Sequence, residues 1–394
     1  MKPFQLIDRT NGGSIKNDLL SGITVALALV PEAVAFAFVA GISPIIGLYG
    51  AFMMGLVTSI FGGRPGMISG ATGAMAVVMV HLVREGNQLG GTDSSGLQYL
   101  FGALLLAGIL QIFAGLLKLG KFVRMIPHSV MMGFVNGLAI VIFISQLGMF
   151  KSNGNWLQGS ALFIMIALVS TTMLIMAFLP LITKKIPAAL IAIILVSLVV
   201  ILGDLDTETV KSFIVTNGGK GIKAGLPNFQ IPLISFSLDT LFFIAPYSFI
   251  LASIGLIESL MTLNLIDELT DTHGSGNREC VAQGAGNILN SFFGGMGGCA
   301  MIGQSIINIK SGGRGRLSGI TAALALLFFI LFGSSYIEQV PIAALVGVMF
   351  MVVLGTFAWS TFKVWNKVPT ADVIVILLVT IITVFFDLAI AVLS

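Results

Sequence analysis

The sequence predicts an all-α, polytopic membrane protein built from two inverted halves of seven transmembrane segments each (a 7+7 inverted repeat). Three observations predict this fold. The chain has 394 residues, of which 56% are hydrophobic and 9% charged, whereas soluble proteins carry about 25% charged residues. Apolar runs long enough to cross a bilayer follow one another along the chain. Two shorter, glycine-broken runs occupy matching places in the two halves.

Apolar runs of spanning length, about 20 residues, define the expected segments. They fall at 19–39, 44–61, 97–117, 126–150, 158–182, 187–203, 239–262, 281–296, 317–334, 340–361 and 370–387. Two further runs, 73–83 and 300–309, have about half that length and would cross only half of the hydrocarbon. A last run begins at Asp387 and is too short to span.

We therefore expect fourteen segments in two halves. Residues 1–203 form the first repeat, 204–238 an extracellular linker rich in Gly, Asn, Lys, Asp and Pro, and 239–394 the second repeat, with its last span truncated. An odd number of spans in each half inverts the second half relative to the first.

The repeat is visible in the residues themselves. The segment from Thr72 to Met75 aligns with the segment from Gly298 to Met301 at an offset of 226 residues, and the same offset places Glu32 on Glu258. Paired interrupted helices at matching places in two inverted halves are typical of secondary transporters, with the substrate site between them near the bilayer midplane. We expect half-helices 3 and 10 to meet there.

Charge sets the orientation and excludes other function classes. Fifteen of the twenty Lys and Arg residues fall on the side of the amino terminus and five on the other, which predicts a cytoplasmic amino terminus in a multi-pass protein of the inner (plasma) membrane. A formal net charge of +3 gives no indication of nucleic-acid binding. The sequence lacks a catalytic constellation or metal-ligand spacing, so we do not expect an enzyme. Membrane lipid is the expected surrounding.

The two half-length helices are the best anion candidates. Each begins inside the membrane, near Gly73 and near Ala300, with unpaired backbone N–H groups and a partial positive charge. Two such ends could hold an anion without Arg or Lys, and Thr72 adds a hydroxyl group. The alternative is that the small residues only allow close helix packing, as Gly133 and Gly137 do in a GxxxG pattern. Packing does not explain two half-length spans.

Two lone acids lie inside apolar segments. Glu258 has Thr262 one turn further on, so a carboxylate and a hydroxyl share one helix face. An ionised carboxylate within the membrane normally faces a cavity or a partner, which suggests a cation ligand or a proton carrier, although a purely structural acid is the alternative. Glu32 follows Pro31, with Phe36 one turn on. A role in lining the site and a structural role remain equally open for Glu32 and Phe36.

Several motifs resemble the sulfate permease (SulP) family of anion transporters. They are VPEAVAFA at 30–37, SGATG at 69–73, GGCAMIGQS at 297–305 and NIKSGG at 308–313. The resemblance covers essentially the whole chain. It implies a core domain (spans 1–4 and 8–11) that moves against a gate domain (spans 5–7 and 12–14) in an elevator-like manner, with the anion between half-helices 3 and 10. We also expect a homodimer.

The segment from Ile257 to Thr262 is similar to the acid-x-x-x-Thr segment of sodium-dependent bicarbonate transporters in this family. The resemblance implies sodium on Glu258 and Thr262 and on the backbone around Gly298 and Ala300. It also implies an anion, bicarbonate or sulfate, near Thr72 and Gly73 and the backbone of Ala300, Met301 and Ile302.

Two departures from the family pattern bear on coupling. Glu258 stands where the bicarbonate transporters have Asp, and this longer side chain could equally serve protons. Gln304 stands where many relatives have Arg, so the expected site lacks that positive charge. An anion site with an acid and without Arg favours symport with a cation.

The leading interpretation is sodium-coupled bicarbonate symport. The alternatives are proton- or sodium-coupled uptake of sulfate or a dicarboxylate, and an uncoupled anion channel; no organic cofactor is expected. Members of the family usually carry a cytoplasmic regulatory (STAS) domain after the last span. This sequence ends before one, so we expect it to be part of a longer protein.

Overall fold

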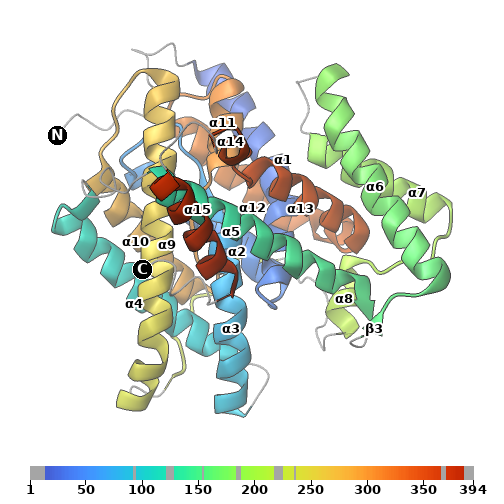
Figure 1. Cartoon of the computed structure of the whole chain (residues 1–394), viewed down its shortest axis with the longest axis horizontal. Coiled ribbons are helices and arrows are strands. Elements are labelled where there is room, and N and C mark those ends of the chain that lie inside the picture. Colours follow the sequence, from blue (N-terminus) through green and yellow to red (C-terminus); the bar gives the residue numbers. More distant parts are fainter. Residues whose placement is uncertain are drawn as a thin grey trace. The chain divides into compact units, whose positions relative to one another are not determined.

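A computed structural model describes residues 14–91, 95–120, 128–152, 155–182, 188–216, 225–234, 237–364 and 370–385. The chain divides into two compact units, each made of two separate stretches of sequence. Figure 1 shows and labels their helices. Unit 1 comprises Met1–Met125 and Ala224–Phe332, and unit 2 comprises Ile126–Lys223 and Gly333–Ser394.

Unit 1 contains the paired interruptions. Its elements are α1 (Ile15–Val39), α2 (Pro44–Phe61), β1 (Ser69–Ala71), α3 (Gly73–Gly90), α4 (Ser95–Leu116), α9 (Leu238–Thr270), α10 (Gly276–Phe293), β4 (Gly298–Ala300), α11 (Ile302–Lys310) and α12 (Arg316–Glu338), whose last residues run past the end of the unit. Helix α4 packs against α3, α9 and α10, and α1 packs against α2, α3 and α11.

Local sequence explains where several of these helices begin and end. Pro44 opens α2 at a position where its missing N–H costs nothing. Gly91 and Gly294 close α3 and α10 in the left-handed conformation, with φ of 68° at each, which glycine adopts without strain. The Ser237 hydroxyl caps α9 by accepting from the Thr240 amide at 3.2 Å.

Unit 2 contains α5 (His128–Leu147), η3 (Gly148–Phe150), β2 (Lys151–Ser152), β3 (Asn155–Trp156), α6 (Gly159–Ile182), α7 (Ala188–Leu202), α8 (Val210–Thr216), α13 (Ile342–Thr356), α14 (Ser360–Val364) and α15 (Thr370–Phe385). Helix α5 packs closely on α15: a Cβ at Gly133 would lie 2.7 Å from the Ile376 oxygen, and one at Gly137 would lie 2.4 Å from the Thr383 Cβ. The GxxxG pattern here therefore serves helix packing, as expected for small residues.

Among the described residues, eight helices are long and apolar enough to cross a membrane. Large apolar side chains are widely exposed on them; on α6, for example, Phe163 is 75% and Leu181 80% exposed. Contiguous exposed apolar surface of this kind marks contact with lipid or with a partner in a folded protein. This distribution of exposed apolar side chains is consistent with the predicted multi-pass membrane protein.

The expected spans up to 370–387 are helices, with some corrections to their bounds. Helix α3 has 18 residues and ends at Gly90, not at 83. Its extra turns carry polar residues such as Arg84 and Glu85, both exposed, because the apolar run marks only the membrane part of a helix that continues to its glycine cap. The expected span 340–361 is divided, since α13 ends at Thr356 and α14 begins at Ser360.

Other expectations concern the linker and the last span. The region 204–238 contains the short helix α8, which apolar periodicity did not predict. The run from Asp387 to Ser394 lies outside the described residues.

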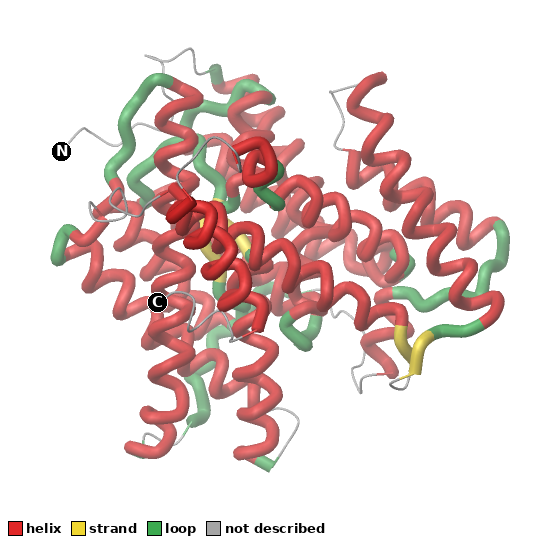
Figure 2. Tube along the Cα trace, viewed as in Figure 1, coloured by secondary structure: helices red, strands yellow, loops and turns green. Residues whose placement is uncertain are grey.

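The interruptions themselves form a strand pair. Strands β1 and β4 are antiparallel, with Ser69 opposite Ala300, Gly70 opposite Cys299 and Ala71 opposite Gly298 (Figure 2). All six residues are buried. Expecting a helix from Ala300 onward was therefore wrong by two residues, because strand β4 extends to Ala300 and α11 begins at Ile302.

Candidate functional site

Two helices start from the β1–β4 pair. Thr72 is the N-cap of α3 and Met301 the N-cap of α11, so each helix begins directly after its strand. The first amides of a helix have no partner within it and carry a partial positive charge. Helix α11 has only nine residues, a length of about 14 Å at 1.5 Å per residue. Of the two half-length helices that the sequence predicts, α11 has the predicted length, whereas α3 has 18 residues.

The close approach of the strands depends on glycine. A Cβ at Gly298 would lie 2.2 Å from the Gly70 backbone oxygen, a distance that no side chain tolerates. Asn287 of α10 holds Gly298 in both directions: its Oδ1 accepts from the Gly298 amide at 3.0 Å and its Nδ2 donates to the Gly298 oxygen at 3.1 Å. Asn287 Nδ2 also donates to Gln111 of α4 at 2.9 Å. The interruption is thus clamped by two neighbouring helices.

The amides of Ala300 and Met301 are already engaged. The Ala300 amide donates to the Ser259 hydroxyl at 3.1 Å, and the Met301 amide donates to the Ile68 oxygen at 2.9 Å. Neither is free to donate to an anion, which corrects the expected role of these two amides. The first-turn amides of α11 begin at Ile302, and the next residue, Gly303, is exposed with no atom within 4 Å of a Cβ placed on it. Open space therefore adjoins this turn.

Glu258 joins the same region from α9. The Cys299 thiol donates to Glu258 Oε2 at 2.9 Å, and the Thr72 hydroxyl also hydrogen-bonds the Glu258 carboxyl group. Thr72 Oγ1 lies 3.2 Å from Cys299 Sγ. Thr262, one turn further along α9, donates from its hydroxyl to the Glu258 backbone oxygen at 2.8 Å and lies 3.5 Å from the Ala300 oxygen.

The structure thus brings together most of the residues that the sequence selected separately. Thr72, expected at the anion, meets Glu258, expected at the cation. Thr262 faces the Ala300 carbonyl, and the Gly298 carbonyl belongs to the same strand. The residue that sequence reasoning missed is Cys299, although it stands within the interrupted motif itself.

Glu32 belongs to another contact. Its carboxyl group, on α1, is hydrogen-bonded by the Gln304 side chain of α11. Gln304 is 2% exposed, and its Oε1 lacks a hydrogen-bond partner among the described residues. Phe36, one turn on from Glu32, is 4% exposed. Glu32 therefore lies against the second helix of the pair and not in the Glu258 cluster.

Oxygen atoms dominate the possible cation ligands. Among the described residues, His, Cys, Asp and Glu do not gather in groups of three or more that could hold a metal ion. The oxygen ligands available around Glu258 are its own carboxylate, the Thr262 hydroxyl and the backbone carbonyls of β4. Oxygen ligands of this kind fit a hard cation, and the lone sulfur suits softer metals.

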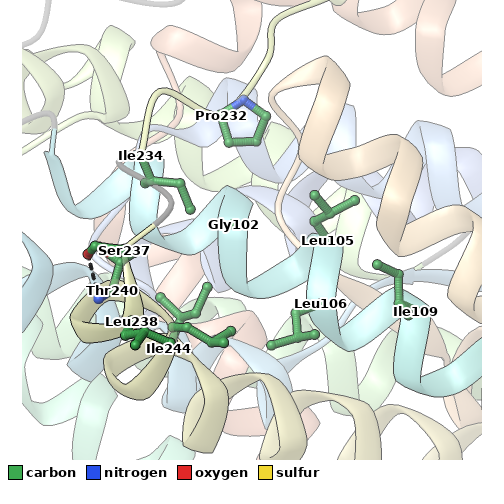
Figure 3. Close-up of a pocket in the computed structure, with 11 residues that line it drawn as sticks. Gly102, Leu105, Leu106, Ile109, Pro232, Ile234, Ser237, Leu238, Thr240 and Ile244 are labelled. Carbon is green, nitrogen blue, oxygen red and sulfur yellow. Dashed lines mark hydrogen bonds between the residues drawn. The ribbon is translucent and has the colours of Figure 1, made fainter.

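A separate cavity of about 320 Å³ lies between α4 and the start of α9 (Figure 3). Its walls are largely aliphatic, with Leu105, Leu106 and Ile244 among them, and the Ser237 hydroxyl lies at its edge. It contains none of the candidate residues. An apolar cavity offers little to an inorganic anion, so this cavity is distinct from the candidate site.

Comparison with known proteins identifies relatives along the whole chain. The sulfate permease family matches residues 15–154 and 153–380. YbaR of Bacillus subtilis, provisionally named a sulfate transporter, is 47% identical over 94% of this chain and 73% of its own length. The bicarbonate transporter BicA of Synechocystis is 33% identical over 99% of this chain and 70% of its own length.

Solved structures agree on the fold. The transmembrane domain of a cyanobacterial BicA superimposes with a TM-score of 0.83 at 32% identity, covering 96% of this chain and 97% of that domain. Murine Slc26a9 in the inward-facing state superimposes with a TM-score of 0.80 at 18% identity, covering 96% of this chain and 66% of that protein. Both matched membrane domains have the 7+7 inverted repeat.

The matched family and the relatives along the whole chain define a polytopic anion transporter, not an enzyme. The chain belongs to the sulfate permease family. The predicted family, the inverted-repeat fold and the transport class are therefore confirmed.

Proposed function

We propose that this protein is a secondary transporter that carries bicarbonate together with sodium. The observation that carries the proposal is the Glu258 cluster: Glu258 of α9 contacts Thr72 and Cys299 at the starts of the paired elements. A carboxylate beside an anion site repels the anion, so a cation that balances its charge would favour anion binding. The relatives named BicA support bicarbonate as the anion.

In this proposal the anion lies against the first turns of α3 and α11. Donors come from the amides at Gly73 and from Ile302 onward, and Thr72 lines the site. Sodium binds Glu258 and Thr262, with the carbonyl oxygens of Gly298 and Ala300 as further ligands. Backbone amides supply part of the proposed anion site and backbone carbonyls part of the proposed sodium site. Substrate binding therefore depends on the β1–β4 pair more than on any basic side chain.

A second candidate is cation-coupled uptake of sulfate or a dicarboxylate. The 47% identity with YbaR, provisionally named a sulfate transporter, favours it. The same cluster would then couple the transport of a larger anion to sodium or to protons. An uncoupled channel is disfavoured, because a channel gains nothing from an acid at its anion site.

We further propose an elevator-like motion. All proposed ligands lie in unit 1, so the core (spans 1–4 and 8–11) can carry both ions as one body past the gate (spans 5–7 and 12–14). Inverted repeats provide two near-equivalent conformations for such an alternation. We also propose that the protein lies in the inner membrane as a homodimer with a cytoplasmic amino terminus. Of the lysines and arginines expected on the cytoplasmic side, those at 2, 9, 121, 124, 184, 185 and 367 lie outside the described residues.

Uptake into proteoliposomes tests the substrate directly. Labelled bicarbonate and labelled sulfate are each offered with an inward sodium gradient and with the same gradient of potassium. The proposal expects bicarbonate to accumulate only with sodium. Sulfate accumulation without bicarbonate accumulation would establish the second candidate, and equilibration of the label without accumulation under either gradient would indicate a channel.

A further inference from the structure

Cys299 connects the two proposed ligand sets. It lies on β4, is 0% exposed, and lies between Thr72, the N-cap of α3, and Glu258 of α9. Its Sγ is 3.2 Å from the Thr72 hydroxyl and 2.9 Å from Glu258 Oε2. Thr72 and Glu258 come from opposite halves of the repeat.

The direction of these hydrogen bonds follows from the number of hydrogens. A thiol has a single S–H, and here it donates to Glu258 Oε2. In the contact with Thr72 the sulfur can therefore only accept, and the single hydroxyl hydrogen of Thr72 lies within reach of both this sulfur and the Glu258 carboxyl group. The thiol thus compensates Glu258 Oε2, and the cation is assigned to the other carboxylate oxygen.

The sulfur is better suited to this role than to binding the cation. Thiol sulfur is a soft, weak ligand for a hard cation such as sodium, whereas a donor to a ligating carboxylate fixes its rotamer and its charge. The strand also fixes the sulfur: Cys299 pairs with Gly70 across the sheet, and both flanking residues of β4 are tied to α9 or α10 through Ser259 and Asn287.

We propose that Cys299 is a positioning residue for the coupling cation: its thiol holds the Glu258 carboxylate so that the free oxygen faces Thr262 and the Ala300 carbonyl. This inference rests on the proposed function, since it assumes that Glu258 binds the cation. It assigns the thiol a role in cation affinity and leaves the anion to the helix amides.

The test compares Cys299→Ala, which removes the donor, with Cys299→Ser, which restores one at nearly the same size. Cys280→Ala is the matched control, because Cys280 is also a free, buried cysteine and lies on α10. The half-saturating sodium concentration is measured in purified protein from the rise of the unfolding temperature on adding sodium chloride, with choline chloride as the salt control. It is measured again from bicarbonate uptake.

Loss of an outer-shell partner typically weakens cation binding about 10–100-fold. We expect Cys299→Ala to raise the half-saturating sodium concentration by about tenfold or more. The bicarbonate KM at saturating sodium should stay close to that of the wild type. Cys299→Ser and Cys280→Ala should both retain the wild-type sodium dependence. If Cys299→Ala does not fold, Cys299→Val fills the space without a donor and takes its place.

An unchanged half-saturating sodium concentration in Cys299→Ala would overturn the role of Cys299. An equal rise of this concentration in Cys299→Ser would overturn it as well, because it would indicate that only the packing of the cysteine matters. A wild-type protein whose stability and uptake both ignore sodium would instead overturn the proposed function, so the two failures are distinguishable.

Discussion

The side-chain amide of Asn287 pairs in both directions with the backbone of Gly298, at 3.0 and 3.1 Å. This contact fixes β4 where it meets β1, and the two strands in turn fix the starts of α3 and α11. The proposed ion sites therefore depend on a backbone arrangement that α10 holds in place.

Gly298→Ala should disrupt the strand pair. Its Cβ would lie 2.2 Å from the Gly70 oxygen and 2.8 Å from the Gly70 carbonyl carbon, and backbone atoms cannot move aside as a flexible side chain can. We expect a loss of stability of at least about 1–3 kcal/mol and loss of transport, measured by thermal unfolding and uptake.

Gly303→Ala is the matched control, since a Cβ there has no atom within 4 Å. It should unfold at the wild-type temperature. Equal destabilisation by both substitutions would show that the β1–β4 contact does not set the stability of this region.

Ile302→Pro should weaken anion binding without unfolding α11. Ile302 is the first residue of the helix, where proline is well tolerated, and Met301 before it is already extended, with φ −106° and ψ 118°, as a residue before proline prefers. The change removes one amide donor. A hydrogen bond to a charged group contributes about 1.5–3 kcal/mol, so the anion KM should rise about tenfold or more.

Lys310→Ala, at the exposed end of the same helix, should leave the anion KM unchanged. A rise with the lysine substitution, but not with the proline, would mean that a side-chain cation and not the helix amides holds the anion.

The extent of prediction from sequence differs between the fold and the site. The expected bounds 44–61 match α2, because the apolar run begins at Pro44 and stops before Gly62, and these two residues also begin and cap the helix. Helix α3 runs past its apolar part because solvent-exposed turns continue to Gly91. Apolar periodicity reports burial in lipid, so it marks membrane segments better than helix ends.

At the site, the sequence indicated Glu258 and the glycine-broken segments separately. Their meeting through Cys299 depends on a strand pair between residues more than two hundred positions apart, which no local pattern encodes. The same strand occupies the amides of Ala300 and Met301, so the anion donors begin later than the interruption in the sequence indicates.

The orientation of the chain can be tested by labelling. Both native cysteines are buried, at 1% and 0% exposed for Cys280 and Cys299, so introduced thiols report alone. Lys310→Cys should react with a membrane-impermeant maleimide only in inside-out vesicles, and Asn155→Cys, also exposed, only in right-side-out vesicles. The reverse pattern would place the amino terminus outside.

The elevator-like motion predicts a rigid core. Spin labels at Leu89, which is 63% exposed at the end of α3, and at the exposed Lys310 of α11 should keep a constant distance with and without bicarbonate and sodium. The distance from Leu89 to Leu202 of unit 2, 82% exposed, should change. A variable distance between Leu89 and Lys310 would show that the site is dismantled during each cycle.

The central claim is that Glu258 couples the anion to a cation. The most direct measurement is sodium-driven accumulation of labelled bicarbonate in proteoliposomes by Glu258→Gln, with Glu85→Gln as the control, because Glu85 is an exposed acid that contacts Tyr247 away from the cluster. Glutamine keeps the size of the side chain and removes its charge. The account predicts that Glu85→Gln accumulates bicarbonate as the wild type does, whereas Glu258→Gln folds but no longer responds to the sodium gradient. Accumulation by Glu258→Gln at the wild-type rate and with the wild-type sodium dependence would contradict it.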